Sequence, residues 1–188
     1  KIKMKKIVYL IIVFLLIFFT GCATKSSLVL KDGYSFKEKP SINIDKITNN
    51  TSKIYEHNIE ETRNEALIQE FKDNNRLALS NNSNIDLEVP ILNYEEGNAF
   101  KRWLMPGWGA TILNVEAILK ENGNIIATSK INNNIPAGGA YTIGAWRQVF
   151  FDTAEKSALD ILEKIMQTPG EQEEGKQYIH HPVIAGRI

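Results

Sequence analysis

The sequence is poor in the residues that build covalent or metal-centred frameworks. Cys22 is the only cysteine among 188 residues, and there are three histidines. A single cysteine excludes an internal disulfide framework and the cysteine-rich zinc modules. Lysine plus arginine numbers 22 and aspartate plus glutamate also numbers 22, so no basic excess is present to bind a phosphate backbone. We therefore expect no nucleic-acid partner.

A hydrophobic run long enough to cross a membrane is also missing. Residues 7–19 are consecutive apolar residues, but a helix of that length spans about 20 Å, against a hydrocarbon core of about 30 Å. The run follows Met4-Lys5-Lys6 and precedes Thr20-Gly21-Cys22. A basic start, a short apolar run and a small residue before the cleavage site are typical of a secretory signal peptide.

The segment Phe19-Thr20-Gly21-Cys22 resembles the lipobox of bacterial lipoprotein signal peptides, which usually reads Leu-Ala/Ser-Gly/Ala-Cys. Gly21-Cys22 matches, and Phe19 stands where leucine is usual. The resemblance implies signal cleavage after Gly21 and lipidation of Cys22, with acyl chains such as palmitate that anchor the protein firmly. Ala23 and Thr24 follow the cysteine, with no aspartate beside it, which in enteric-type sorting implies an outer-membrane location facing the periplasm. A membrane-spanning anchor and a plain secreted protein with a free thiol are the alternatives.

The charge balance supports a division of the chain. Residues 1–21 hold four lysines and no acid, so the remainder has 18 basic and 22 acidic residues. We expect a lipoprotein signal peptide over 1–21, a flexible tether over 22–40, a periplasmic domain over 41–168 and a C-terminal tail over 169–188.

Hydrophobic periodicity predicts an α+β fold for the domain. The pattern favours a single four-stranded mixed or antiparallel sheet with two helices packed on one face, in the order β-α-β-β-β-α. Strands are expected near residues 42–47 and 85–91, and helices over 58–79 and 144–166. Pro90 lacks an N–H, so its strand should lie at an edge or carry a bulge there.

Residues 110–131 predict a β-hairpin with its turn at Asn122-Gly123. A two-residue loop would pair Glu121 with Asn124 and set Leu119 opposite Ile126. A three-residue loop would pair Lys120 with Asn124 and set Leu119 opposite Ile125, with Gly123 in the left-handed position of a bulge. We favour the three-residue loop, because it keeps the apolar residues of both strands on one face.

The most unusual segment, residues 100–110, joins two expected strands and contains two of the three tryptophans. Trp, Tyr and Arg dominate binding hot spots, so we predict a partner-binding group made of Phe100, Arg102, Trp103, Met105, Trp108 and, from the start of the last helix, Trp146. The alternative is that this segment folds back to cover one end of the core.

Catalytic and metal sites are not expected. Gly107-Trp108-Gly109 precedes a strand and opens no helix, so it is not a phosphate loop. His180-His181 has no cysteine or spaced carboxylate to complete a metal site. No serine stands in a nucleophile elbow. We therefore expect no enzyme activity and no cofactor.

Residues 42–165 resemble a family of uncharacterised bacterial lipoproteins with a periplasmic domain of unknown function. The similarity is carried by Arg102-(x)3-Pro106-Gly107-Trp108-Gly109-Ala110, then Val115-(x)3-Leu119, Gly123-Asn124-Ile125-Ile126, Gly138-Gly139 and the helix with Ala154 and Ala158. The resemblance supplies no catalytic residues.

These observations favour a lipoprotein that is anchored in the membrane through Cys22 and acts as a non-catalytic binding or assembly component of the cell envelope, with an envelope protein as its partner. The alternative is a carrier or sensor of a small hydrophobic ligand, with the same aromatic residues lining a pocket.

Overall fold

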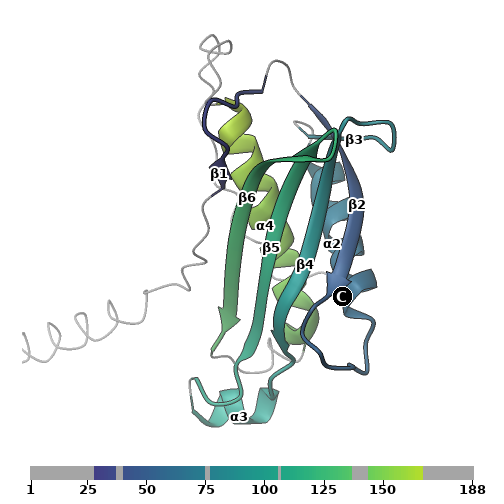
Figure 1. The fold of residues 1–188 in the computed structure, drawn as a ribbon. Coiled ribbons are helices and arrows are strands. Elements are labelled where there is room, and N and C mark those ends of the chain that lie inside the picture. The colour runs from purple at the N-terminus through teal and green to yellow at the C-terminus, as the bar shows by residue number, and fades with distance from the viewer. Residues whose placement is uncertain (1–27, 37–39, 75–76, 106, 137–143, 167–188) are drawn as a thin grey trace, which may run out of the picture.

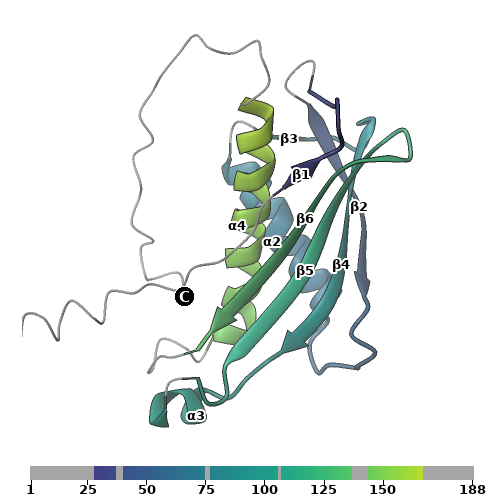
Figure 2. The ribbon, with the colours of Figure 1, turned by 60° about the vertical axis from the view of Figure 1, so that its left-hand side comes forward.

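A six-stranded mixed sheet carries two long helices on one of its faces (Figures 1 and 2). This computed structural model describes residues 28–36, 40–74, 77–105, 107–136 and 144–166. The strand order is β1-β6-β5-β4-β2-β3. The strands are β1 Val29–Leu30, β2 Ser41–Asn49, β3 Ala78–Leu79, β4 Ile85–Glu95, β5 Thr111–Glu121 and β6 Asn124–Ile135; the helices are α2 Ile59–Asp73, α3 Ala99–Leu104 and α4 Ala145–Met166.

The predicted α+β class and the placement of two helices on one face are confirmed (Figure 2). The predicted numbers, four strands and two helices, are wrong, because β1, β3 and α3 were not expected. Two-residue strands and a six-residue helix are too short to carry a hydrophobic period. Within the described ranges, no helix is long and apolar enough to cross a membrane.

Several predictions concern residues outside the described ranges: the signal peptide with Gly21 and Cys22, Gly138-Gly139, and the tail with His180 and His181. The expected tether over 22–40 is too long, however. β1 pairs with β6, and the side chains of Leu28 and Phe36 are buried in the core. Burial of these two apolar side chains makes residues 28–36 part of the folded body.

Helix α2 ends six residues before the predicted boundary. Asn74 leaves helical geometry and caps the helix, with its backbone N–H donating to the Glu70 carbonyl. An asparagine side chain competes for backbone hydrogen bonds and disfavours a continuing helix. Ala78–Leu79 adds as β3 beside Ser41 and Ile42 of β2, in parallel.

Strand β4 lies inside the sheet, although it contains Pro90. It pairs in parallel with β2 and antiparallel with β5, so the edge position allowed for Pro90 is wrong. The bulge does occur nearby: the register against β5 shifts between Ile91 and Asn93. The extra residue, Leu92, faces solvent, and the irregularity accommodates a strand with a missing donor.

The β5–β6 hairpin has a two-residue turn, so the predicted three-residue loop is wrong. Glu121 pairs with Asn124, and Asn122 and Gly123 have φ of 50° and 79°, as a turn matched to strand twist requires. A register shift next to Leu119 then sets it opposite Ala127. This bulge at Ile126 restores the expected faces: Leu113, Val115, Ala117, Leu119 and Ile131 are all buried.

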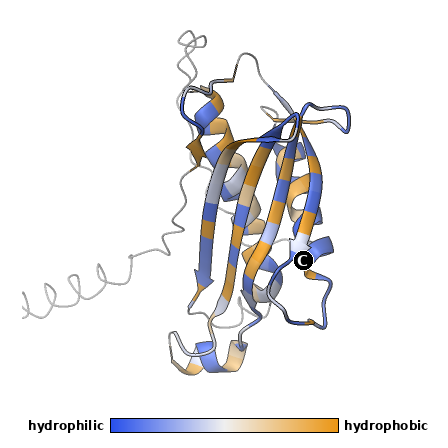
Figure 3. Cartoon of the chain, viewed as in Figure 1, coloured by the Kyte–Doolittle hydropathy of each residue, from blue (hydrophilic) through white to orange (hydrophobic). Residues whose placement is uncertain are grey.

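The core lies between the sheet and the two helices. Alternate residues of β4 and β5 point into it, which Figure 3 shows as alternating bands along these strands. Phe71 of α2 and Phe150 and Ile161 of α4 close it from the other side. The outer face of the sheet is polar, with an ion pair between Glu88 and Lys120.

Candidate functional site

Helix α3 projects beyond the ends of β4 and β5, away from the sheet and the long helices (Figures 1 and 2). The chain leaves β4 after Glu95, forms α3 and returns to β5 at Thr111. We call the described residues between them, 96–105 and 107–110, the α3 projection. β4 and β5 are adjacent antiparallel strands, so this segment is the long connection of a β-hairpin.

Backbone hydrogen bonds close the base of the α3 projection. The Asn98 N–H donates to the Gly109 carbonyl at 2.8 Å. The Asn98 side chain caps α3 by accepting from the Lys101 N–H at 3.0 Å, which satisfies one of the free donors at a helix start. Met105 then ends the helix with its N–H on the Lys101 carbonyl. The two arms of the projection are therefore held together.

Arg102 locks this base from the inside. Its side chain is only 3% exposed, and Nη1 donates to the Gly109 carbonyl at 3.0 Å and to the Thr111 Oγ1 at 2.7 Å. The Thr111 hydroxyl in turn donates to the Glu96 carbonyl at 2.7 Å. The guanidinium thus ties α3 to the beginning of β5, and the Thr111 hydroxyl ties β5 to the residue that follows β4.

Two glycines make this packing possible. Gly97 and Gly109 have φ of 75° and 72°, a region that favours glycine. A Cβ at Gly97 would lie 2.5 Å from the Arg102 Nη1, and a Cβ at Gly109 would lie 2.7 Å from the Lys101 Cβ. Gly107 also has a positive φ, but a Cβ there would meet nothing within 4 Å.

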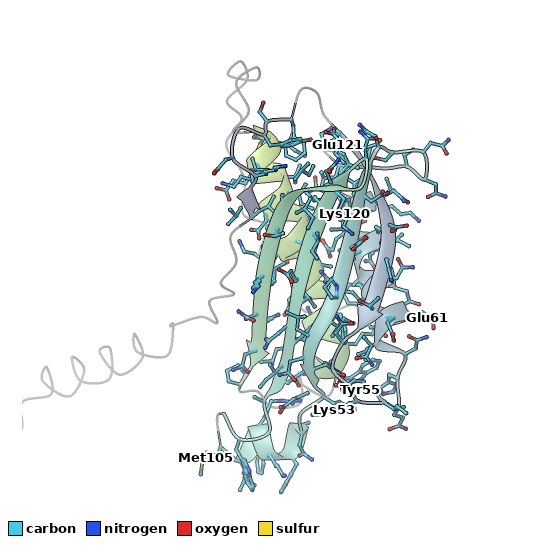
Figure 4. All side chains as sticks on the ribbon, in the orientation of Figure 1. Lys53, Tyr55, Glu61, Met105, Lys120 and Glu121 are labelled. Atoms are coloured by element: carbon cyan, nitrogen blue, oxygen red, sulfur yellow. The ribbon has the colours of Figure 1, made fainter. Side chains whose placement is uncertain are left out.

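The outer surface of the α3 projection consists of large apolar side chains. Five of them are exposed to solvent: Phe100 at 67%, Trp103 at 65%, Leu104 at 53%, Met105 at 60% and Trp108 at 48%. The rings of Phe100 and Trp103 lie 6.0 Å apart. The Lys101 ammonium lies 5.4 Å from the centre of the Trp108 ring. Figure 4 shows Met105 at the end of the molecule that carries α3.

The structure therefore brings together Phe100, Trp103, Met105 and Trp108 of the predicted partner-binding group. Arg102 does not belong to that surface, because its guanidinium points inward to bind backbone and Thr111. Trp146 is not part of that exposed surface: it is half-buried at the start of α4 and stacks on His57 with ring centres 4.0 Å apart, beside the base of the projection. Leu104 was missed, although its spacing of four from Phe100 puts both on one helix face.

A second apolar tip, also missed, lies at the same end of the molecule (Figure 4). Ile54, in the loop between β2 and α2, is fully exposed. This loop is braced by Tyr55, whose hydroxyl lies within donating distance of two acceptors, the Tyr94 carbonyl at 3.1 Å and the Thr51 Oγ1 at 2.9 Å, and shares its one hydrogen between them. Burial raises the pKa of Tyr94, which packs against Tyr55.

In the described parts of the chain, no cluster of three or more His, Cys, Asp or Glu side chains is placed to hold a metal ion. Among the described residues, His57 has one carboxylate at contact distance: its Nε2 lies 4.0 Å from the Glu96 Oε1.

Comparison with known proteins finds similarity in fold. No family model matches the sequence, and no curated protein matches it. The structure resembles the PelC dodecamer from Paraburkholderia phytofirmans, with a TM-score of 0.51, 10% identity, and coverage of 71% of this chain and 96% of that chain. It also resembles protein XCC0632 from Xanthomonas campestris, of family-model DUF330, with a TM-score of 0.52, 12% identity, and coverage of 77% and 94%.

At these identities the similarity concerns the fold alone. It agrees with the expected α+β domain, and one of the two neighbours belongs to a family of unknown function. No residue of the α3 projection takes a role from either neighbour.

Proposed function

We propose that this protein is a non-catalytic binding component of the bacterial cell envelope. In this proposal a lipid on Cys22 anchors it to the outer membrane on the periplasmic side, and the α3 projection engages a second envelope component. The observation that carries the proposal is the group of five exposed apolar side chains on a braced projection. Contiguous apolar surface of this kind typically marks an interaction site.

The bracing supports binding rather than core coverage. Asn98, Arg102 and the two close-packed glycines already fix the backbone of the projection. A surface that is ordered before it meets its partner loses little conformational entropy on binding. The aromatic rings are also exposed to solvent. The alternative, in which this segment covers the end of the core, therefore explains why Arg102 is buried but not why Trp103 is exposed.

The exposure of the aromatic residues favours a surface contact over an enclosed ligand site. A carrier of a small hydrophobic ligand buries most of its ligand in a concave pocket, and Trp103 and Trp108 would line that pocket. Both rings instead face solvent. PelC, which shares the fold, forms a dodecamer, and this supports a role for the fold in assemblies.

The test is photocrosslinking in living cells. A photoreactive amino acid replaces Trp103 in the full chain, which is expressed in the bacterium that naturally makes the protein. The matched control carries the same amino acid at Ile125, which is also exposed but lies at the hairpin turn, at the opposite end of β5. We expect adducts with protein or lipid from position 103 and few from position 125. If position 103 gives no adducts above those at position 125, the proposed function is wrong.

A further inference from the structure

The end of the molecule that carries the α3 projection has two apolar tips, and hydrogen bonds brace both. The first is the projection with Phe100, Trp103 and Leu104. The second is the loop with Ile54, which Tyr55 ties to the carbonyl of Tyr94. Tyr94 stands at the end of β4, two residues before the projection begins. Both tips are therefore braced against the same strand end.

We infer that these two tips enter the interface of a phospholipid bilayer. This inference rests on the proposed function and names the component that the α3 projection meets. A flat bilayer surface can contact two separate tips at one end of a molecule at the same time. A protein partner would need a groove that matches the shape of each tip. The projection is convex, as Figures 1 and 2 show, and a convex apolar group is suited to insertion.

The composition of the α3 projection is that of a bilayer interface anchor. Tryptophan is enriched where headgroups meet acyl chains, and Phe, Leu and Trp form the inserted face of interfacial helices. Lys101 lies over the Trp108 ring, so its ammonium can stay among the headgroups while the ring enters the acyl region.

The charges around the tips agree with this occupant. Apart from Glu96 at its base, the α3 projection has no aspartate or glutamate, so insertion of its outer part takes no carboxylate into the acyl region. Lys53 is exposed beside Ile54, and exposed acids also lie near the tips, among them Glu56, Glu95 and Glu96. With cations and acids both present there, insertion depends mainly on the apolar side chains.

The experiment uses the full chain, held by its own N-terminal segment in vesicles of phosphatidylethanolamine and phosphatidylglycerol with or without brominated acyl chains. One variant keeps only Trp103 as fluorophore (Trp108→Phe and Trp146→Phe). The matched control removes all three tryptophans by substitution with phenylalanine and carries Ile125→Trp at the opposite end. These conservative changes leave aromatic rings in place, and circular dichroism verifies the fold.

We expect brominated lipid to lower the emission of Trp103 by about twofold or more, because the ring enters the acyl region, and to leave the Ile125→Trp emission unchanged. Adding Lys101→Glu to the Trp103 variant should reduce the quenching, because a carboxylate is costly near acyl chains. Equal quenching of both fluorophores, or no quenching of Trp103, overturns the bilayer inference.

The two proposals fail separately. If Trp103 is not quenched but position 103 crosslinks to a protein in cells, the bilayer inference is wrong and the proposed function stands. If Trp103 is not quenched and position 103 gives no adducts above the control, both are wrong.

Discussion

Arg63 is a fully buried arginine at the junction of the two long helices. From α2 it donates to three uncharged oxygens of α4: the Phe150 carbonyl at 3.1 Å, the Thr153 Oγ1 at 3.0 Å and the Ser157 Oγ at 2.8 Å. Burial lowers the pKa of its guanidinium to about 9, because the charged form loses its hydration. The three hydrogen bonds of Arg63 therefore join the two helices and also offset the cost of removing its guanidinium from water.

We predict that Arg63→Met changes the free energy of unfolding by less than about 1 kcal/mol, because an apolar side chain of similar length fills the site without the desolvation cost. Arg63→Ala should lose about 3 kcal/mol by leaving a cavity. Thr153 and Ser157 stay paired in both variants, since their hydroxyls also donate to the Val149 and Thr153 carbonyls. Urea unfolding measures both values; equal losses would contradict the prediction.

Asp152 gives a prediction about pH. Burial raises the pKa of its carboxyl, although the Gln148 amide donates to it and acts in the opposite direction. The folded state then holds the proton more tightly than the unfolded state, so this group lowers stability as pH rises from about 4 through the folded pKa. Asp152→Asn should therefore be more stable than wild type at pH 7, by less than about 1 kcal/mol.

The same comparison at a pH near 3 should show little difference, because Asp152 is then protonated in both states. Glu155→Gln, on the exposed side of α4, is the control for loss of a negative charge from this helix. Urea unfolding midpoints across this pH range check the prediction. A gain that is the same at every pH would show that the effect does not come from titration.

Among the elements, the α3 projection depends on close backbone packing at Gly97 and Gly109. We predict that Gly97→Ala costs about 2 kcal/mol or more, because a left-handed conformation costs about 1 kcal/mol and the clash with Arg102 adds to it. Gly107→Ala, with the same kind of φ and open space around it, should cost only about 1 kcal/mol.

Hydrogen exchange locates these effects. In Gly97→Ala the amides of residues 97–111 should exchange faster while those of α4 stay protected, because the projection opens without unfolding the core. Protection that is unchanged in the projection, or lost in α4 to the same extent, would contradict the role assigned to these contacts.

How well the sequence predicted each element follows from its length and periodicity. β4, β5 and α4 are long and strongly patterned, so their positions were predicted closely. β1 and β3 depend on partners distant in sequence, Thr128 and Ser41 for example, which local patterns do not contain. The hairpin shows the same limit: the buried faces were predictable from alternation, whereas the turn and the compensating bulge were not.

The candidate site was predictable in composition and not in orientation. The tryptophans, Phe100 and Met105 in one short connection marked the surface that the structure exposes. Arg102 has the same chemistry as a hot-spot residue, and only the path of the chain through Gly97 and Gly109 shows that it points inward. Ile54 stands alone in a polar loop, and no sequence pattern distinguishes an exposed isoleucine there from a buried one.

At the scale of the whole molecule, the lipid proposed at Cys22 would decide how the protein is held. We predict that Cys22→Ser either moves the protein out of the membrane fraction after an alkaline wash or leaves a larger, unprocessed chain, because no acyl group can be added to serine at this step. Fractionation with immunoblotting, and the mass of the chain, check both outcomes. Unchanged mass and unchanged fractionation would contradict lipidation at Cys22.

Strand β1 determines how the domain would respond to a pulling force. It is the first described element. In the described part of the chain its backbone links to β6 are the pairs Val29–Thr128 and Leu30–Ala127 and the Lys31 N–H on the Ile126 carbonyl at 2.8 Å, and the Leu28 side chain before it is buried in the core. A load transmitted from a lipid anchor would reach these few contacts before the long strands, whose pairings run along most of their length. β1 would then detach from β6 first. Its release would add several residues to the extended chain between the membrane and the domain, while the other strands stay paired.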